Sequence, residues 1–576
     1  MPIKNRKKNY KLYETTHFAD FREMTENVAE KYPDRVAFRW KDAPNDKDTK
    51  SITFKESRDT IRAIATEAFS MGLSGKKAAI IGGASVEWFF SYTALMSVGV
   101  VTVPIDKELP VADMASIINT SAAEVIFFSD SIHDKILEVK AACPSVSLLV
   151  AMGNPIEGTL SVSDIVAAGK SKLDAGDRAY FDYEIDREGL ASIVFTSGTT
   201  GKGKGVMLSL KNICSDMEQG MYNFNITPKT MFVLPPHHTF GSTVNFVGHF
   251  AQGCEIYISS GIRYILNELK EFKPTHLILV PLFVETFYKR IMATAEKTGK
   301  LATLKKGIKI SNALRKIGID LRKKLFGESV LSSFGGELEM IICGGAALNQ
   351  NIIDFFESIG VVILNGYGIT ECAPLISCNR NECRKNGSVG MPIIGGKVKI
   401  DNPNEQGEGE ICYTGPNVML GYFGEEEATR AVIDGEGYFH TGDLGRVEVI
   451  DGDQWIYITG RSKNLIILSN GKNVYPEELE TDIQGIYGVG EVVVYEGLSA
   501  DMHSTDVIVA EIFPDFDALK LHNIDNPQKY FEDEIKKINA GNAPYKAIGK
   551  VKIRQEEFPK NTSRKITRFK LDKTID

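Results

Sequence analysis

Short apolar runs alternate with longer amphipathic segments along most of the chain. Apolar runs with the length of a buried strand occur at 78–81, 125–128, 277–280, 340–343 and 361–364. Segments with helical periodicity separate them, which is typical of sheets covered by helices, with ligand-binding loops where the strands end. The pattern therefore predicts an α/β fold of helix-covered sheets.

One uncharged run, residues 88–105, reaches the minimum length of a membrane span. It contains serine, threonine, glycine and proline, and it divides naturally into a buried helix followed by a strand at 100–103. The basic N-terminus lacks the apolar core of a secretion signal. We therefore expect a soluble, cytoplasmic protein.

An apolar run that begins at Ile193 leads directly into a loop of threonine, serine, glycine and lysine, IVFTSGTTGKGKGV. Glycines let the backbone approach an anion, hydroxyls can donate to phosphate oxygens, and lysines add positive charge. The loop lacks the Gly-Lys-Ser/Thr ending of a Walker motif. A simple linker is the alternative. The candidate phosphate ligands are Thr196, Ser197, Gly198, Thr199, Thr200 and Lys204.

A second loop with chemical potential follows the apolar run at 361–364 and reads Asn-Gly-Tyr-Gly-Ile-Thr-Glu. The ring of Tyr367 can stack on adenine, the Thr370 hydroxyl can bond a phosphate, and the Glu371 carboxylate can hold Mg²⁺. A plain turn with a solvated Glu371 is the alternative. The candidate nucleotide ligands in this loop are Asn365, Gly366, Tyr367, Gly368 and Thr370.

These two loops, in this order, resemble the signatures of adenylate-forming enzymes, a superfamily that includes acyl-CoA synthetases, peptide-synthetase adenylation domains and luciferases. Four later segments resemble the same family: 438–443 with Tyr-Phe-His-Thr-Gly-Asp, 460–464 with Gly-Arg-Ser-Lys-Asn, 469–480, and 558–568 near the C-terminus. The chain departs from the family pattern at Gly203, where proline is usual, and at Arg564, where glycine is usual.

The resemblance implies a fold and a set of residue roles. It implies that a large N-terminal domain of helix-covered sheets, 1–462, binds the nucleotide, and that a smaller mobile α+β domain, 463–576, rotates about a hinge at Lys463. ATP, Mg²⁺ and coenzyme A are the implied cofactors. Asp443 and Arg461 bind the ribose, Gly345 and Ala346 contribute to the nucleotide site, and Gly471 faces the site in the thioester-forming state. The implied catalytic residues are Thr196, His238, Glu371 and Lys565, and the metal ligands are Thr196 and Glu371.

The acid substrate is indicated by two further features. The segment 234–241, with His237-His238-Thr239-Phe240, resembles the gate motif of long-chain acyl-CoA synthetases. The segment 289–324 carries twelve Lys or Arg against Glu296 and Asp320, and it resembles a helical insert of the same group. Phe240, Val244 and Val247, spaced by one helical turn, are candidates for an acyl pocket, with core packing as the alternative for the valines.

We therefore expect ATP-dependent activation of a long-chain fatty acid, followed by thioester formation with coenzyme A. Two alternatives stay open: an acyl carrier protein or another acceptor in place of coenzyme A, and a non-catalytic nucleotide- or acyl-binding protein. The basic segment 289–324 can rest on the inner face of an anionic membrane, or it can be a solvated helical face.

Composition narrows the partners. The formal net charge of −8 provides no overall positive field for nucleic acid. The eight cysteines form no CxxC pair, and the spacing of Cys372, Cys378 and Cys383 suits neither a zinc ribbon nor an iron–sulfur site. Reduced thiols and no nucleic-acid partner are the expectations.

Overall fold

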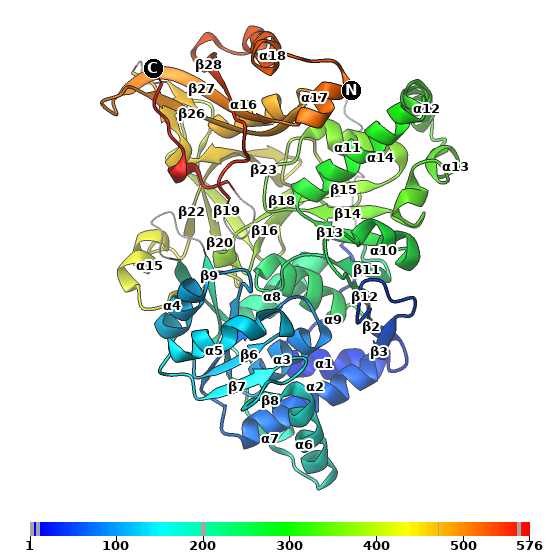
Figure 1. Cartoon of the computed structure of the whole chain (residues 1–576), viewed down its shortest axis with the longest axis vertical. Helices are drawn as coiled ribbons and strands as arrows, with labels where there is room; N and C mark the ends of the chain where they lie inside the picture. The colour runs from blue at the N-terminus through cyan, green and yellow to red at the C-terminus, as the bar shows by residue number, and fades with distance from the viewer. Residues whose placement is uncertain (1–4, 7–11, 197–202, 470–471, 561–565, 576) are drawn as a thin grey trace. The chain divides into compact units, whose positions relative to one another are not determined.

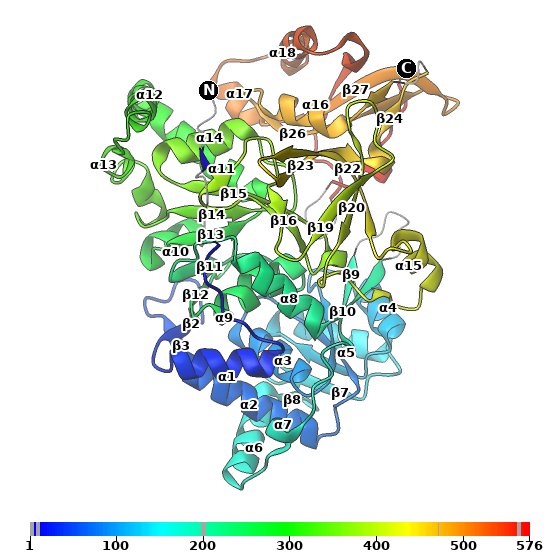
Figure 2. The ribbon, with the colours of Figure 1, turned by 180° about the vertical axis from the view of Figure 1, so that it is seen from behind.

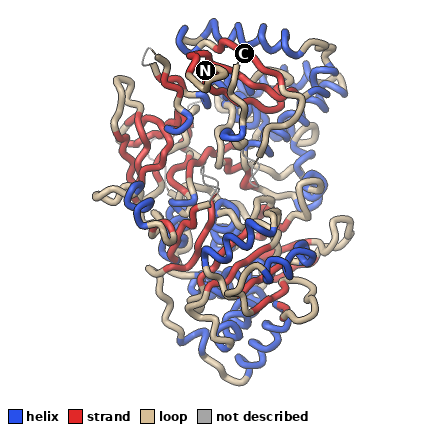
Figure 3. Tube along the Cα trace, turned by 60° about the vertical axis from the view of Figure 1, so that its left-hand side comes forward, coloured by secondary structure: helices blue, strands red, loops and turns tan. Residues whose placement is uncertain are grey.

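The computed structural model describes residues 5–6, 12–196, 203–469, 472–560 and 566–575. The chain forms two compact units. The first unit comprises 1–346, 351–397 and 414–437, and the second comprises 347–350, 398–413 and 438–576. Strands and helices alternate along both units, so the predicted α/β class is confirmed (Figure 3).

An eight-stranded sheet forms one layer of the first unit, in the order β21-β10-β9-β5-β4-β6-β7-β8. Strands β4 to β9 run parallel, whereas β10 and β21 are antiparallel additions at one edge. The bounds are β4 (Lys77–Ile81), β5 (Val101–Ile105), β6 (Val125–Phe128), β7 (Leu148–Ala151), β8 (Leu160–Ser161), β9 (Leu190–Thr196), β10 (Lys204–Ser209) and β21 (Gly421–Tyr422).

A nine-stranded sheet forms the second layer, in the order β18-β16-β15-β14-β13-β11-β12-β2-β3. Its central strands are parallel and its edges antiparallel. The bounds are β2 (Val36–Trp40), β3 (Lys50–Thr53), β11 (Lys229–Phe232), β12 (Glu255–Ile258), β13 (His276–Leu279), β14 (Met340–Cys343), β15 (Val362–Gly368), β16 (Leu375–Cys378) and β18 (Met391–Pro392). All five strands expected from apolar runs exist, within one residue at their starts.

Helices cover both sheets (Figures 1 and 2). They are α1 (Phe21–Lys31), α2 (Phe54–Ser70), α3 (Val86–Met96), α4 (Val111–Ser121), α5 (His133–Ala141), α6 (Val162–Asp174), α7 (Ala179–Asp182), α8 (Leu210–Met221), α9 (His249–Ala251), α10 (Ile265–Phe272), α11 (Pro281–Lys297), α12 (Leu301–Arg315), α13 (Arg322–Phe326), α14 (Gln350–Ile359) and α15 (Glu426–Val432). The uncharged run 88–105 forms the buried helix α3 and the strand β5, as predicted. Among the described residues, no helix is both long and apolar enough to cross a membrane.

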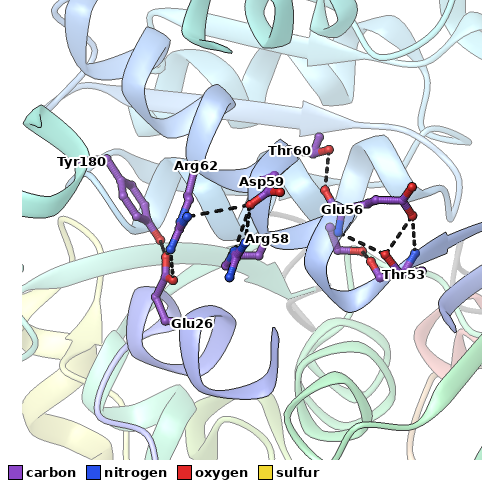
Figure 4. A network of polar contacts seen from close by, with 9 residues as sticks. Glu26, Thr53, Glu56, Arg58, Asp59, Thr60, Arg62 and Tyr180 are labelled. Carbon is purple, nitrogen blue, oxygen red and sulfur yellow. Dashed lines mark hydrogen bonds and ion pairs between the residues drawn. The ribbon is translucent and has the colours of Figure 1, made fainter. Parts of the chain in front are cut away.

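Polar contacts fix the start and the packing of α2 (Figure 4). Thr53 and Glu56 form a capping box, in which the Glu56 amide donates to the Thr53 hydroxyl at 3.2 Å and the Thr53 amide donates to the Glu56 carboxylate at 2.8 Å. Arg62, two turns further along, pairs with Glu26 of α1, and the Tyr180 hydroxyl of α7 donates to the same carboxylate at 3.3 Å. One carboxylate thus joins three helices.

Two side chains on one face of α8 anchor distant loops. The Asn212 amide donates to the carbonyls of Pro416 and Val418 at 2.8 and 2.9 Å. One turn later, the buried Asp216 carboxyl accepts from the Leu375 amide at 2.9 Å and from the Asn417 side chain at 3.0 Å. Burial raises the pKa of Asp216 well above its ordinary value. Burial therefore disfavours the charged form of this carboxyl.

The second unit combines a four-stranded sheet, β19-β20-β22-β23, with a three-stranded sheet, β26-β27-β28, and helices. Their bounds are β19 (Lys397–Asp401), β20 (Gly409–Thr414), β22 (Phe439–Ile450), β23 (Asp453–Arg461), β24 (Ile466–Ile467), β25 (Asn473–Val474), α16 (Pro476–Gln484), β26 (Val489–Leu498), β27 (Ser504–Pro514), α17 (Phe516–Leu521), α18 (Pro527–Gly541) and β28 (Ile548–Ile553). This is the expected α+β composition. The predicted domain boundary at residue 462 is the position of a hinge for rotation, and the division into compact units does not test rotation. This boundary stays a prediction.

Replacing Asp216 tests how the raised pKa of this buried carboxyl affects the stability of the fold. Because its pKa is raised in the fold, Asp216 favours folding fully below its unfolded pKa of about 4, and this contribution falls as pH rises, by up to about 1.4 kcal/mol per pH unit. Asp216→Asn has no such titration, so we expect its free energy of unfolding relative to the wild type to increase with pH. Urea unfolding midpoints between about pH 5 and 8 measure this.

Two further variants complete this test. Asp216→Leu leaves the Leu375 amide without an acceptor and removes one of the three acceptors of the Asn417 side chain, which should cost about 1 to 3 kcal/mol at every pH. Arg322 holds the pKa of Asp320 at about 2, so the deficit of Asp320→Asn should stay constant over the same window. If the difference in free energy of unfolding between Asp216→Asn and the wild type does not change with pH, the raised pKa of Asp216 is contradicted.

Candidate functional site

The predicted site residues of the first unit lie where parallel strands end. Thr196 is the last residue of β9, Gly344 and Gly345 follow β14, and Tyr367 lies near the end of β15. Ligands of open α/β sheets bind at the carboxyl ends of the strands. Six of the predicted residues lie outside the described part of the chain: Ser197, Gly198, Thr199, Thr200, Gly471 and Lys565.

Thr196 and Lys204 face each other across the hairpin of β9 and β10. The Thr196 hydroxyl donates to the Lys204 carbonyl at 3.5 Å. A β carbon at Gly203 would lie 2.7 Å from the Thr196 carbonyl oxygen, closer than such contacts normally allow. The glycine that replaces the usual proline therefore fits a narrow hairpin, which keeps Lys204 beside Thr196.

Tyr422, which was not among the predicted residues, joins Lys204 to Glu371. Strand β21 pairs with β10 and places the ring so that the Lys204 ammonium lies 4.6 Å from its centre, a cation–π distance. The Tyr422 hydroxyl donates to the Glu371 carboxylate at 2.9 Å. Burial and the Glu371 charge raise the pKa of Tyr422, so the hydroxyl keeps its proton. One ring thus holds a cation and a carboxylate in fixed positions.

Close backbone contacts shape the loop that carries Glu371. A β carbon at Gly368 would lie 2.1 Å from the Pro374 carbonyl oxygen, so only glycine fits there. The Ile369 amide donates to that same oxygen at 2.8 Å, and the Met419 amide donates to the Glu371 carbonyl at 2.8 Å. Thr370 opens the short helix η4 (Thr370–Cys372). This backbone directs Glu371 toward Tyr422.

The remaining nucleotide candidates of this loop lie in β15. Asn365 pairs with Cys343 of β14, and its carbonyl accepts from the Asn379 amide at 2.8 Å. Gly366 and Tyr367 pair with β16, and the Tyr367 side chain is mostly buried. The aromatic residue is therefore held by the sheet, and its role in adenine stacking stays a prediction.

The segment after the histidine pair forms a π-helix, η2 (Phe240–Gly248), rather than the α-helix that its spacing indicated. A π-helix uses more residues per turn, so the spacing of Phe240, Val244 and Val247 does not place them on one stripe. Val244 and Val247 are buried, whereas Phe240 is half-buried. Their role in an acyl pocket stays a prediction, and Phe240 is its most accessible member.

Phe240 meets the nucleotide strands at Gly344. A β carbon at Gly344 would lie 3.3 Å from the Gly366 carbonyl oxygen and 3.4 Å from the Phe240 ring. Gly345 follows with φ of +89°, a conformation that favours glycine, and Ala346 comes next. Gly344, which was not among the predicted residues, therefore lies between the predicted gate residue Phe240 and the predicted nucleotide residue Gly366, directly before Gly345.

The histidine pair lies at the start of η2. The His238 carbonyl accepts from the amides of Gly241 and Ser242, both at 2.8 Å, and the His237 and His238 ring centres are 4.2 Å apart. His237 Nε2 lies 3.6 Å from the Asp106 carboxylate, and burial lowers the pKa of His237 to about 4. His238 is thus fixed through its backbone at the turn that begins the gate.

In the second unit, Asp443 and Arg461 are paired across β22 and β23. The Arg461 Nε lies 2.9 Å from the Asp443 carboxylate, which is buried. The Glu410 carboxylate accepts from the Gly442 amide at 2.8 Å and lies 3.1 Å from His440 Nδ1. The predicted ribose ligands therefore lie together on a supported turn. Lys463 follows in η5 (Ser462–Asn464).

Cysteine chemistry agrees with the sequence. All eight cysteines lie in the described part of the chain, where their side chains are buried and form no disulfide. Cys412 contacts His440 at 3.4 Å beside Glu410, so one group of potential metal ligands exists among the described residues. Their mutual contacts support the turn before Asp443.

Comparison with known proteins decides the family. A family model described as "AMP-binding enzyme" matches residues 25–423, more than half of the chain. The chain belongs to the AMP-binding enzyme family. The resemblance to adenylate-forming enzymes is therefore confirmed, and at this level the protein is an acyl-activating ligase.

Relatives within this family share just over a quarter of their residues with the chain. A chloroplastic long-chain-fatty-acid–[acyl-carrier-protein] ligase of Arabidopsis thaliana is 28% identical, over 81% of this chain and 73% of its own length. The long-chain-fatty-acid–CoA ligase FadD15 of Mycobacterium bovis is 27% identical, over 77% and 75%.

Solved structures show the same fold. The anthranilate CoA ligase AuaEII in complex with anthranoyl-AMP has a TM-score of 0.75 at 20% identity, covering 97% of both chains. ATP-bound MatB from Rhodopseudomonas palustris has a TM-score of 0.73 at 22% identity, covering 95% of this chain and 97% of its own.

Removing the Tyr422 hydroxyl tests its link to Glu371. Tyr422→Phe keeps the ring beside Lys204 but loses a hydrogen bond to a charged group, so we expect ATP affinity in the presence of Mg²⁺ to fall about tenfold. Without Mg²⁺ the loss should be small, because Glu371 is the proposed metal ligand. Tyr422→Leu also removes the cation–π contact and should weaken binding in both conditions. Isothermal titration calorimetry measures both affinities.

The second unit offers a matched control for this test. The buried Tyr495 also donates to a carboxylate, Glu511, at 2.8 Å. Tyr495→Phe should therefore leave ATP affinity unchanged with and without Mg²⁺. Equal effects of Tyr422→Phe in the two conditions would contradict the proposed metal link.

Proposed function

We propose that this protein activates a long-chain fatty acid with ATP through an acyl-adenylate and then transfers the acyl group to coenzyme A. The observation that carries the proposal is the Tyr422 side chain, which contacts both Lys204 and Glu371, while Lys204 pairs with Thr196 at the end of β9. A cation, a carboxylate and a hydroxyl in this arrangement suit the phosphates of a nucleotide and an oxygen-loving divalent cation.

In the first step, a carboxylate oxygen of the fatty acid bonds to the α-phosphorus of ATP, and the bond from that phosphorus to pyrophosphate breaks. Lys204, Lys565 and the hydroxyls of Thr196, Thr199 and Thr370 would stabilise the negative charge on the phosphates. Mg²⁺, held by Glu371 and Thr196, would supply further charge neutralisation. Asp443 and Arg461 would hold the ribose, and Tyr367, Asn365 and Gly345 the base.

In the second step, a thiol sulfur bonds to the acyl carbon and AMP leaves with the bonding electron pair. The family resemblance implies rotation about Lys463, which withdraws Lys565 and presents Gly471. The printed names of the relatives support two acceptors, since the Arabidopsis ligase names an acyl carrier protein and the Mycobacterium ligase names CoA. Acyl carrier protein therefore remains the second candidate acceptor.

The fatty-acid assignment rests on the gate. The half-buried Phe240 ring borders Gly344, which directly precedes the candidate nucleotide residues Gly345 and Ala346, and this supports a place for the acyl chain beside the ring. The histidine pair anchors the turn that starts η2 through the His238 carbonyl. The long-chain names of both relatives agree with this assignment.

Chain-length dependence is the main test. Each methylene buried in an acyl pocket contributes about 0.8 kcal/mol, so kcat/KM should rise about fourfold per carbon until the pocket is full. Acids of two to eighteen carbons, assayed by pyrophosphate release with CoA or acyl carrier protein as acceptor, give this dependence. A flat response, or a preference for aromatic acids, would contradict the long-chain substrate.

The gate offers a control within the same assay. Phe240→Ala should change the chain-length preference while leaving the KM for ATP within about twofold, because the ring borders the acyl side of Gly344. Absence of pyrophosphate release with every acid, in a protein that still binds ATP, would favour the non-catalytic alternative.

Replacing Lys565 distinguishes the two steps of the proposed reaction. Lys565→Ala should lower adenylate formation by about tenfold to a hundredfold or more, because a charge-assisted contact to the reacting phosphate is lost. Thioester formation from supplied acyl-adenylate should be spared. Lys560→Ala is the matched control, because Lys560 pairs with Glu491 and Glu557 and should leave both steps intact. Equal losses in both steps would contradict the role of Lys565.

A further inference from the structure

The basic segment 289–324 forms a local surface whose charge is opposite to that of the whole chain. It holds twelve Lys or Arg and two acids, in a chain with a net charge of −8. Its residues form the end of α11, all of α12, and α13. Figures 1 and 2 show α12 and α13 at the periphery of the first unit, outside α11 and α14.

The solvent-exposed face of helix α12 carries apolar side chains as well as lysines. Leu304 and Ser311 are buried on its inner face. On the outer face, Ile310 is 46% exposed and Ile317, just past the helix, is 71% exposed. Ala313 lies between them and is exposed, so the three residues form one outward stripe at helical spacing.

The stripe continues toward α13 and is surrounded by cations. Ile319 and Leu325 are 45% and 39% exposed. The exposed lysines around these apolar residues are Lys305, Lys306, Lys309, Lys316, Lys323 and Lys324. Within the described residues, none of these six forms a salt bridge, and the nearby Asp320 is paired with Arg322. We call these six lysines, with Ile310, Ala313, Ile317, Ile319 and Leu325, the α12 face.

From this arrangement we propose that the α12 face binds the surface of an anionic lipid bilayer. Exposed isoleucines among lysines suit the boundary between headgroups and acyl chains, where the apolar side chains enter the lipid and the ammonium groups contact anionic headgroups. Lysine stems can lie along the lipid while their charges stay in water. A purely electrostatic partner would leave the isoleucines exposed, which disfavours nucleic acid.

This inference is independent of the proposed reaction, because it rests only on the exposed side chains and their charge. If both hold, the protein binds where long-chain acids accumulate. A surface contact of this kind requires no membrane-spanning helix.

Sedimentation of the full chain with lipid vesicles tests the inference. We expect binding to vesicles of equal parts phosphatidylglycerol and phosphatidylcholine, and little binding to pure phosphatidylcholine. Binding should weaken as salt is raised, because salt screens exposed charges. Equal binding to both vesicle types, or to neither, would overturn the proposal.

Two variants separate the charged and apolar contributions. Replacing Lys305, Lys309 and Lys316 by Gln should lower the vesicle partition coefficient about a hundredfold. Ile310→Ser with Ile317→Ser keeps the charge and should lower it about tenfold. Because all five residues are exposed, the variants should keep the wild-type thermal midpoint and circular dichroism spectrum.

Exposed residues elsewhere in the first unit supply matched controls. Lys55, Lys140 and Lys170 are exposed, and replacing them by Gln makes the same change in net charge. Leu137 is 57% exposed on α5 beside Lys140, so Leu137→Ser matches the loss of an exposed apolar side chain. These controls should bind vesicles as the wild type does; losses equal to those of the α12 variants would refute a specific face.

An acidic carrier protein is the competing occupant. If the α12 lysine variant lost carrier-protein binding while the wild type ignored anionic vesicles, the face would be a protein-docking surface and the lipid proposal would be wrong. Vesicle binding that is unaffected by excess carrier protein would support the lipid assignment.

Discussion

The buried contact between Asp216 and Asn417 holds together the parts of the first unit on which the candidate site depends. Asp216 lies on α8, and the two loops that it contacts carry Glu371 and Tyr422 nearby in sequence. The Asn417 side chain also donates to the carbonyls of Cys372 and Leu375 at 2.7 Å. Burial raises the pKa of Asp216 because it disfavours the charged carboxylate, and the two hydrogen bonds that Asp216 accepts offset part of that cost.

Close backbone contacts at two glycines shape the rest of the candidate site in the first unit. Gly203 and Gly368 occupy positions where a β carbon would collide with a carbonyl oxygen, and each directs the adjacent functional side chain. Tyr422 then fixes the separation of Lys204 and Glu371. Charges held in this way need little reorganisation when a phosphate arrives, which is the general source of electrostatic catalysis.

Much of this architecture was predictable from local sequence. The strands at 125–128 and 340–343 match their apolar runs, and α16 begins at Pro476, where a proline followed by acidic residues favours a helix start. Such features depend on near neighbours along the chain. The motif resemblance identified Thr196, Glu371, Asp443 and Arg461 as candidate site residues. The structure brings Asp443 and Arg461 into contact.

Other features depend on distant contacts and escaped prediction. Tyr422 lies 51 residues from Glu371 in the sequence. The only general signal for its role is that a buried tyrosine needs a hydrogen-bond partner. The π-helical form of η2 was hidden because apolar spacing alone was interpreted with the α-helical period. Residues 398–413 join the second unit through strand pairing between β20 and β22, which local periodicity does not encode.

The contact between Phe240 and Gly344 has an evolutionary consequence. A β carbon at 344 would already crowd the Gly366 carbonyl oxygen and touch the Phe240 ring, so a larger side chain must displace one of them, and substitutions at 240 and 344 are not energetically independent. A lineage that alters its acid preference through one of these positions therefore changes which substitutions the other tolerates. If Phe240 lines the acyl pocket as proposed, acid specificity would change through paired substitutions at 240 and 344, constrained by the Gly366 carbonyl on the strand that carries the nucleotide loop.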